Sequence, residues 1–312
     1  MDSTHSKDRA ELTCSGGMDG GAVSGRSRML SADRRPVYTA AAAVLVAAGS
    51  LAVCGLWWPA SAQPVSAAAR VSTSARVSSV PKLPLVAARR VPRGLGDVVW
   101  DVLPTSRKVV AITIDGGWNP AGVKSMLATL RRYHVRATFN ITGRFCRHYP
   151  AYAKAIAADG ELIGNLSNNH PHFPTISDRR IREEVLDGQA EIKAVTAKDP
   201  WPWFRFPYGD YDAHDVYVVN SLGFVPIGWT VDTLGWEGTS GGITVQIVVD
   251  RVLASLRPGE IVLMHFASNL RDHSILDADA LPIVIRKLRA DGYSFVTVSA
   301  LLRMTAASRG QN

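Results

Sequence analysis

The carboxy-terminal part of the chain predicts an α/β domain, a distorted barrel of parallel strands. Short runs of β-branched residues alternate with amphipathic stretches from residue 106 onward. Such alternation is typical of a parallel sheet with helical crossovers. The large number of units in one domain favours a barrel over an open sheet, and polar residues recur where the predicted strands end.

The elements follow from hydrophobic periodicity. In the first predicted helix, Val123, Met126, Leu127 and Leu130 fall on one face. Asp178 is predicted to cap the helix that runs to about Thr196. The predicted strands are 108–114, 137–141, 161–164, 203–206, 224–229, 260–265 and 294–298, and the predicted helices are 121–133, 149–158, 178–196, 213–222, 244–256 and 281–290.

The composition allows one large folded domain and an appendage, since 46% of the 312 residues are hydrophobic. The net charge of +8 comes partly from residues 63–96, which contain six bases and no acid. These bases lie among Ala, Val, Ser and Pro, so we interpret residues 63–105 as a basic linker and 106–304 as the folded domain. A nucleic-acid site would cluster its bases on a folded element, so an anionic envelope surface is the expected neighbour.

The N-terminal region predicts a membrane segment. Residues 1–36 carry mixed charges without a hydrophobic period and are interpreted as a disordered cytoplasmic region. Arg34 and Arg35 precede a charge-free apolar run over residues 37–58, long enough to span a bilayer, with Trp57 and Trp58 as interface anchors. An uncleaved anchor is favoured, but cleavage near Ala62 stays open because small residues surround it. Either outcome predicts an extracytoplasmic domain.

The three cysteines, Cys14, Cys54 and Cys146, fall in three different regions. This distribution excludes a disulfide within one domain. A domain of this size has a core large enough to need no such link.

Polar residues follow several predicted strands and indicate a cleft at one rim of the barrel. Aromatic residues accompany them, and aromatic faces stack on sugar rings. One polar residue at a strand end is usually a turn former, whereas a series on one rim favours a binding or catalytic site. The polar set is Asp115, residues 165–172, Arg205, Tyr208, Asp232 and His265, and the aromatic set is Trp118, Trp201, Trp203, Tyr208, Trp229 and Trp236.

The order of the motifs from 109 to 302 resembles the NodB-homology polysaccharide deacetylases, carbohydrate esterase family 4. Each motif is weak alone, but together they occur in the family's order at domain-sized spacing. They are Thr113-Ile114-Asp115-Gly116-Gly117, Gly164-Asn165-Leu166 through His170-Pro171, Arg205-Phe206-Pro207-Tyr208-Gly209, Trp229 through Asp232 to Gly235-Trp236, Leu263-Met264-His265, and the closing strand Gly292 to Thr297.

The resemblance implies a divalent metal, usually zinc, that polarises an acetamide carbonyl and activates water. It assigns Asp115 as general base, Arg205 as the residue that orients it, and His265 as general acid. A backbone amide beside Tyr208 would stabilise the oxyanion. Asp232 completes the predicted catalytic set. Pro207, Trp118 and Trp236 are predicted to contact the substrate.

The departures from the family pattern concern the metal. Gly116 stands where an Asp ligand is expected, and Leu166 replaces the first His ligand, so only His170 remains. Catalytic zinc sites need about three protein ligands. A remodelled site of Asp115, His170 and His172 is the alternative. Gly235 also replaces the acid that helps to set the late His in the family.

Three functions therefore stay open at this point. The default prediction is a cell-envelope hydrolase that removes N-acetyl groups from amino-sugar polymers, peptidoglycan or chitin-like, with metal assistance. The alternative is a glycan-binding relative that has lost its metal and its activity. A hydrolase that uses Asp115 and His265 without metal ranks last, because an amide is a hard target without a Lewis acid.

Overall fold

The computed structural model describes residues 89–307. The predicted disordered region, the membrane segment and residues 63–88 of the predicted linker lie outside the described residues, so these assignments stay predictions. Within the described part, no helix combines the length and the apolar character needed to cross a bilayer.

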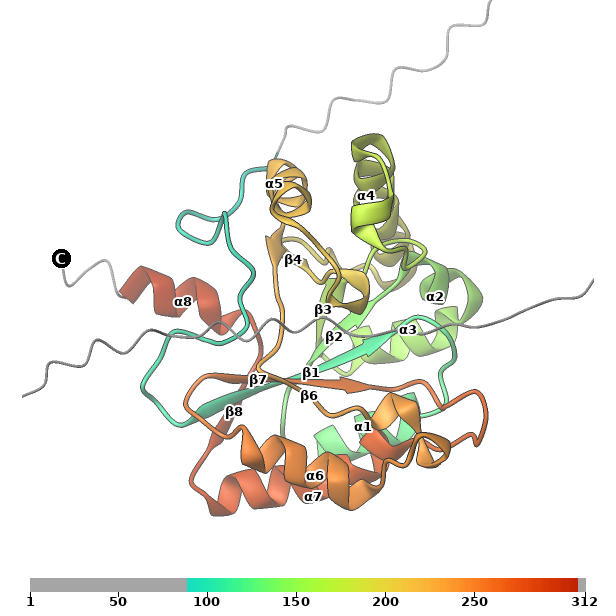
Figure 1. Cartoon of the computed structure of the whole chain (residues 1–312), viewed down its shortest axis with the longest axis vertical. Helices are drawn as coiled ribbons and strands as arrows, with labels where there is room; N and C mark the ends of the chain where they lie inside the picture. Colours follow the sequence, from blue (N-terminus) through green and yellow to red (C-terminus); the bar gives the residue numbers. More distant parts are fainter. Residues whose placement is uncertain (1–88, 308–312) are drawn as a thin grey trace, which may run out of the picture. The chain divides into compact units, whose positions relative to one another are not determined.

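One sheet of parallel strands forms the centre of the domain (Figure 1). Its order is β5-β4-β3-β2-β1-β7-β6, and β8 pairs with the first residues of β1. The predicted parallel barrel class is confirmed. The strands are β1 Val109–Gly116, β2 Thr138–Ile141, β3 Leu162–Asn165, β4 Trp203–Phe204, β5 Val225–Pro226, β6 Val231–Asp232, β7 Glu260–His265 and β8 Ser294–Val296.

The barrel is distorted because β5 and β6 are the two ends of the ladder and do not pair with each other. Instead, the segment before β1 bridges both sides. Trp100 pairs with Ile227 just after β5, and Val102 pairs with Glu260 at the start of β7.

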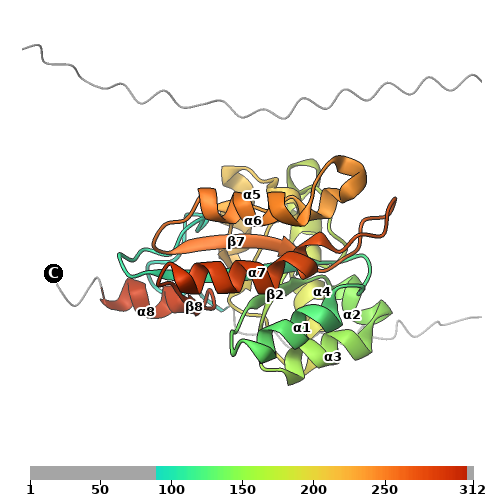
Figure 2. The ribbon, with the colours of Figure 1, turned by 90° about the horizontal axis from the view of Figure 1, so that it is seen from below.

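Helices cover the outside of the sheet. Helices α6 and α7 pack against each other and lie below β7 in the view of Figure 1, and α1 packs against α7 (Figure 2). Helices α2 and α3 pack against α4, which also contacts α5. The helices are α1 Val123–Arg132, α2 Gly143–His148, α3 Pro150–Ala158, α4 Asp178–Thr196, α5 Ala213–Ser221, α6 Val245–Ala254, α7 Leu276–Ala290 and α8 Ala300–Ala307, with 3-10 turns at Phe173–Thr175, Pro207–Gly209, Gly235–Glu237 and Thr239–Gly241.

Strand β1 separates two hydrophobic cores. Successive side chains of a strand point to opposite faces. Val110, Ile112 and Ile114 therefore join the core beneath the helices, while Val109 and Ala111 join a second core on the inner face. The same alternation puts Thr113 and Asp115 on the inner face, where the predicted site lies.

Several boundaries differ from the sequence prediction, and three of the differences are informative. Residues 89–105 were predicted as linker, but Leu95 and Leu103 are buried in the inner core, so the folded unit begins before residue 106. Ser177, not Asp178, is the N-cap of α4, and Asp178 is its first residue. Helix α7 begins at Leu276 and not at 281, although Pro282 lies inside it. Proline is favoured in the first turn of a helix, which made the later start the better prediction.

Among the strands and α-helices, three were missed altogether: β6, α2, and α8, which follows the last predicted strand. Strand β6 has two residues, too few to show a period. Helix α2 has six residues and is separated from α3 by Tyr149. Its N-cap is Thr142, whose Oγ1 accepts a hydrogen bond from the backbone N–H of Phe145 at 3.0 Å. Within α2, Cys146 is buried and free of any disulfide, as predicted for the domain, and burial raises the pKa of its thiol to about 12.

Candidate functional site

The strand register brings the predicted polar residues to one rim. Asp115 is the register partner of Asn140 in β2 and of His265 in β7. On the other side of β2, the backbone N–H of Arg205 donates to the carbonyl of Asn165 at the end of β3. The carboxyl ends of five strands therefore meet here, as the parallel topology requires.

Arg205 fixes Asp115 in one orientation. Oδ1 of Asp115 accepts a hydrogen bond from Arg205 Nη1 at 2.8 Å and another from Asn140 Nδ2 at 2.7 Å. No described side chain donates to Oδ2, which leaves that oxygen available to accept a proton. The predicted orienting role of Arg205 fits this geometry. Asn140 was missed, because an Asn inside a predicted strand carries no sequence signal of its own.

The guanidinium of Arg205 is fully buried, and each of its three nitrogens donates at least one hydrogen bond. Besides Asp115, it donates to Thr113 Oγ1 at 2.8 Å, to the Ile227 carbonyl at 3.0 Å and to the Gly228 carbonyl at 2.7 Å. It also lies over the ring of Trp229 at 5.5 Å. A buried charge is tolerated when its hydrogen bonds are satisfied, so this network holds the inner rim rigidly.

His265 lies beside Asp115 at the end of β7, and a quarter of its side chain is exposed (24%). Burial lowers the pKa of its imidazole, but the carboxylates of Asp277, Asp232 and Asp115 outweigh this effect and raise the pKa above its usual value. The ring meets the edge of Trp236 at 6.4 Å between centroids.

Asp232 contacts the rim without bonding to His265. Its Oδ1 accepts from the Leu234 backbone at 2.9 Å, and its Oδ2 lies 3.4 Å from the indole nitrogen of Trp236. Asp232 therefore positions Trp236 and adds negative charge near the imidazole.

The first metal-ligand position of the family is filled by another residue. A Cβ on Gly116 would overlap the ring of Phe266, which is fully buried. That ring is itself held by Phe145, at 4.9 Å between centroids, and by Phe139 at 6.3 Å. An Asp at position 116 has no room in this packing. Phe266 was not predicted as part of the site, because an aromatic residue directly after a strand is usually interpreted as part of the hydrophobic core.

The remaining metal positions do not supply a donor set either. Leu166 is buried and apolar. His170 keeps a buried Nδ1 without a hydrogen-bond partner, and burial lowers the pKa of its imidazole to about 4. A neutral imidazole with an unpartnered nitrogen is suited to a metal, but one such ligand does not make a site.

His172 is bound by Asp210 and Tyr208 and not by the other residues of the alternative metal site. Its Nδ1 bonds Asp210 at 2.8 Å, and its ring stacks on Tyr208 at 4.0 Å, with about half of the side chain exposed. Within residues 89–307, no group of three or more His, Cys, Asp or Glu side chains could hold a metal ion. The residues present therefore do not fit the zinc that the resemblance implies, either in its usual place or as Asp115, His170 and His172.

The aromatic residues divide into rim and core. Trp118, Tyr208 and Trp236 are about half exposed, at 54%, 54% and 46%. Trp203 and Pro207 are buried, and Trp201 and Trp229 are partly buried. The burial of Pro207 leaves it little surface for the predicted contact with substrate. Trp118 is held by Arg144, which lies over its ring at 5.3 Å.

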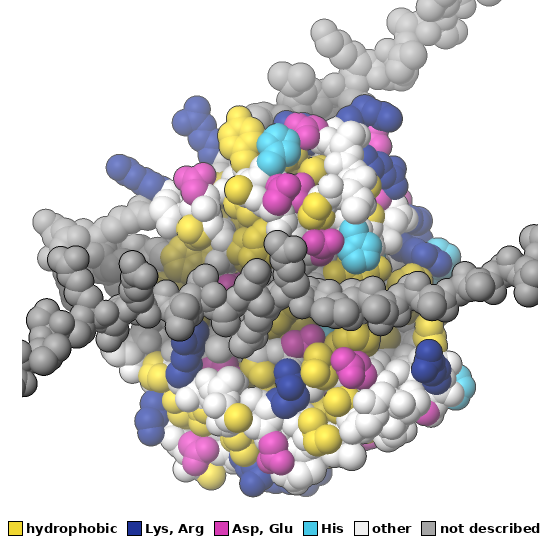
Figure 3. All heavy atoms as spheres, in the orientation of Figure 1, with side chains coloured by type: hydrophobic (Ala, Val, Ile, Leu, Met, Phe, Trp, Pro, Cys, Tyr) yellow, Lys and Arg dark blue, Asp and Glu magenta, His cyan; other side chains and the backbone are white. Residues whose placement is uncertain are grey.

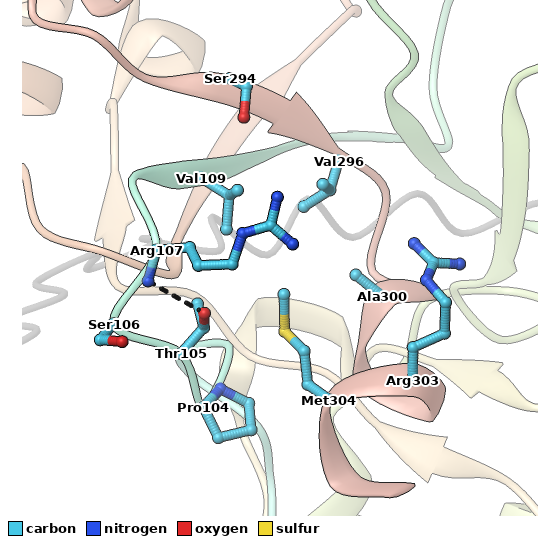
Figure 4. A pocket seen from close by; sticks show the side chains of 10 residues that line it. All are labelled: Pro104, Thr105, Ser106, Arg107, Val109, Ser294, Val296, Ala300, Arg303 and Met304. Atoms are coloured by element: carbon cyan, nitrogen blue, oxygen red, sulfur yellow. Dashed lines mark hydrogen bonds between the residues drawn. The ribbon is translucent and has the colours of Figure 1, made fainter. Parts of the chain in front are cut away.

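A separate hollow of about 640 Å³ lies at the opposite ends of β1 and β8 (Figure 4). Arg107 and Arg303 flank it, and Val109, Val296 and Met304 form its apolar wall. None of the predicted site residues lines it. The rim that carries Asp115 and His265 and the hollow beside Arg107 and Arg303 are therefore two separate sites.

Comparisons with known proteins show the family to which this fold belongs. A family model described as polysaccharide deacetylase matches residues 103–227. A peptidoglycan-N-acetylglucosamine deacetylase of Bacillus cereus is 31% identical over 210 residues, which are 67% of this chain and 94% of that protein. A chitooligosaccharide deacetylase of Azorhizobium caulinodans is 29% identical over 50% of this chain and 72% of its own length.

Solved structures similar to this chain include active enzymes and a pseudoenzyme. The carbohydrate esterase family 4 pseudoenzyme of Bacillus anthracis is 30% identical with a TM-score of 0.57, covering 63% of this chain and 66% of its own. A mutant of it with restored activity is 31% identical with a TM-score of 0.57, over 63% and 68%. A peptidoglycan N-acetylglucosamine deacetylase in complex with an N-hydroxybenzamide is 26% identical with a TM-score of 0.60, over 65% of this chain and 92% of its own.

Proposed function

Because the chain belongs to the polysaccharide deacetylase family, we propose that its rim cleft binds N-acetylated amino-sugar polymers of the cell envelope. Trp118, Tyr208 and Trp236 supply exposed aromatic faces around the polar centre. Aromatic residues in a cleft with a few fixed polar groups are typical of ligand sites. Relatives named for peptidoglycan and chitooligosaccharide substrates support the choice of polymer.

The observation that carries the proposal is the ring of Phe266 in the place of a side chain at Gly116. With that position filled and Leu166 apolar, the cleft keeps its polar centre but has no set of metal donors. Binding without metal-assisted hydrolysis is therefore the function that the geometry supports best.

Hydrolysis of the N-acetyl group is the second candidate, favoured by the intact acid–base residues. The single orientation of Asp115 leaves Oδ2 available to take a proton from water. The raised pKa of His265 favours a protonated imidazole that can donate to the departing amine. This pair alone offers general acid–base catalysis but no Lewis acid, so slow turnover is expected.

The site of action proposed here is outside the cytoplasm. The apolar run over residues 37–58 would either anchor the domain or be cut near Ala62. Basic residues on the visible face of the domain are scattered and do not form one patch, which supports an uncharged or mixed ligand over a nucleic acid (Figure 3).

Calorimetric titration of the purified protein with N-acetylglucosamine oligomers, with glucosamine oligomers as the comparison, tests the proposal. Acetate release is measured on the same samples. Saturable binding that needs the acetyl groups, with no acetate release, supports metal-free binding. Release that His265→Ala and Asp115→Asn both abolish would make hydrolysis the function. Absence of binding to both polymers contradicts the proposal.

A further inference from the structure

A carboxylate fills the space beside Gly235 that an acid occupies in the family pattern. A Cβ on Gly235 would overlap Oδ1 of Asp277 and would lie 2.5 Å from its Cγ and 2.8 Å from its Oδ2. Real Cβ atoms do not approach other atoms so closely. Any side chain at position 235 would therefore displace the carboxylate of Asp277. Gly235 does not have a positive φ, so its backbone can accept other residues.

Asp277 is held in this place from a different element. It lies in the first turn of α7 and is 2% exposed. Its Oδ1 accepts a hydrogen bond from Thr233 Oγ1 at 2.7 Å, and its Oδ2 accepts one from the backbone N–H of His265 at 2.8 Å. Both carboxylate oxygens of Asp277 are thus fixed. Oδ2 is fixed by the backbone of His265, and it also faces the His265 side chain.

The imidazole of His265 faces this carboxylate with an unpartnered nitrogen. Nδ1 of His265 lies 3.8 Å from Oδ2 of Asp277, within reach of an ion pair, and has no hydrogen bond in the described part of the chain. Catalytic hydrogen bonds are often long before a ligand binds and tighten in the complex. No other side-chain acceptor of the described residues bonds to this nitrogen.

Other charged groups also face the imidazole. Asp115 is its register partner in β1, and Asp232 lies on β6, the strand on the other side of β7. Both carboxylates favour the protonated ring, together with Asp277 and against the effect of burial. His170 lies close enough that a charge on either imidazole opposes a charge on the other.

We propose that Asp277 is the positioning residue of His265 and takes over, from helix α7, the place of the acid that Gly235 lacks. By accepting a hydrogen bond from the Nδ1–H group, Asp277 would hold the ring so that Nε2 faces the cleft. Asp277 does not touch the ligand. The pairing of Asp277 with His265 can be measured without glycan. Only the role of Nε2 toward a bound glycan rests on the proposed function.

The test is an NMR titration of the labelled histidine side chains in the full-length protein, which has eight histidines. The signal of His265 is assigned by its loss in His265→Gln. In Asp277→Asn, the pKa of His265 is expected to fall by about 1, since a neighbouring opposite charge is removed. Asp279→Asn, an exposed acid in the same helical turn, is expected to leave it unchanged.

Moving the carboxylate from position 277 to position 235 tests whether the two positions serve the same space beside His265. In the double variant Gly235→Asp, Asp277→Ala, the removed carboxylate leaves room for a side chain at 235, and the raised pKa of His265 is expected to return. An unchanged pKa in Asp277→Asn overturns the proposal. A double variant that is folded but does not recover the pKa also overturns it. Glycan titration of the same samples separates this result from the proposed function, since loss of binding would leave the NMR result standing.

Discussion

Phe266 occupies the space into which a side chain at Gly116 would project, and its ring is packed there between Phe139 and Phe145. A carboxylate, Asp277, likewise occupies the space beside Gly235. The two glycines thus have opposite consequences. Apolar core fills the space at the position of the family's Asp ligand, whereas a negative charge next to His265 fills the space at the position of the family's second acid. The rim brings Asp115, Arg205 and His265 together, but the family's ligand positions Gly116 and Leu166 offer no metal donor.

The packing of Phe266 against Gly116 predicts strong coupling between the two positions. Gly116→Ala is expected to destabilise the fold by about 1–3 kcal/mol through overpacking. Phe266→Ala is expected to cost about 3–5 kcal/mol through the cavity it leaves. In the double variant the added methyl meets no ring, so the losses should be far from additive. Urea unfolding of the four proteins measures this. Additive losses would mean that the two residues do not share one space.

The buried guanidinium of Arg205 predicts that lysine cannot replace it. Arg205→Lys keeps the charge but cannot satisfy Asp115, Thr113 and the two carbonyls at once. Arg205→Ala leaves Asp115 buried without its partner, which is expected to cost about 3–5 kcal/mol. Unfolding in denaturant measures both, with the exposed Arg179→Lys as the matched control. A lysine variant as stable as the parent protein would show that the several donors of the planar guanidinium are not needed for stability.

Glu260 predicts a loss of stability as the pH rises toward neutrality. Burial raises the pKa of its carboxyl to about 7 in the fold, although Ser255 donates to Oε1 at 2.8 Å. Because the folded pKa lies above the usual value of about 4.5, the stabilisation is complete below pH 4.5 and is lost as the pH rises through 7. Glu260→Gln is therefore expected to be more stable than the parent at pH 8, by up to about 3 kcal/mol.

Thermal unfolding between pH 5 and pH 8 checks this expectation. Asp279→Asn, an exposed acid on α7, should follow the parent protein across the same range. If the parent and the Glu260→Gln variant change in parallel with pH, Glu260 is ionised in the fold and the prediction is wrong.

The exposed rim aromatics predict where the glycan binds. Trp236→Ala and Trp118→Ala are each expected to weaken binding of N-acetylglucosamine oligomers by about tenfold or more, the loss typical of a truncated aromatic anchor. Tyr217→Ala removes an aromatic ring that is 65% exposed on α5 and belongs to no rim segment. This control should bind like the parent protein in the calorimeter. Equal loss in all three variants would point to a non-specific surface.

Much of the fold was predictable because it depends on periodicity. Helix α4 was predicted to within one residue at its start and to its last residue, and the runs around β1 and β7 were long enough to be recognised. The register of these two strands then places Asp115 beside His265, and the recurrence of polar residues at strand ends predicted that meeting. A two-residue strand such as β6 has no hydrophobic period to detect, and only its pairing with β7 identifies it as a strand.

The rest of the site could not be predicted because it depends on contacts between distant segments. Asp277 lies in the first turn of α7, which was not predicted because Pro282 suggested a later start of the helix. The residues next to Asp277 in the sequence do not indicate that it contacts Gly235. Phe266 lies 150 residues after Gly116 in the chain, and its identity alone says only that it is apolar. The sequence showed that metal ligands were missing, whereas the structure shows what took their place.

Zinc binding to the purified full-length protein tests the central claim most directly. Elemental analysis after zinc supplementation and dialysis gives the stoichiometry, with His170→Ala as the comparison. The triple variant Gly116→Asp, Leu166→His, Phe266→Ala is the positive control, since it restores two donors and removes the ring. The account predicts no stoichiometric zinc in the parent protein and about one per chain in the triple variant. About one zinc per chain in the parent, lost in His170→Ala, would contradict it.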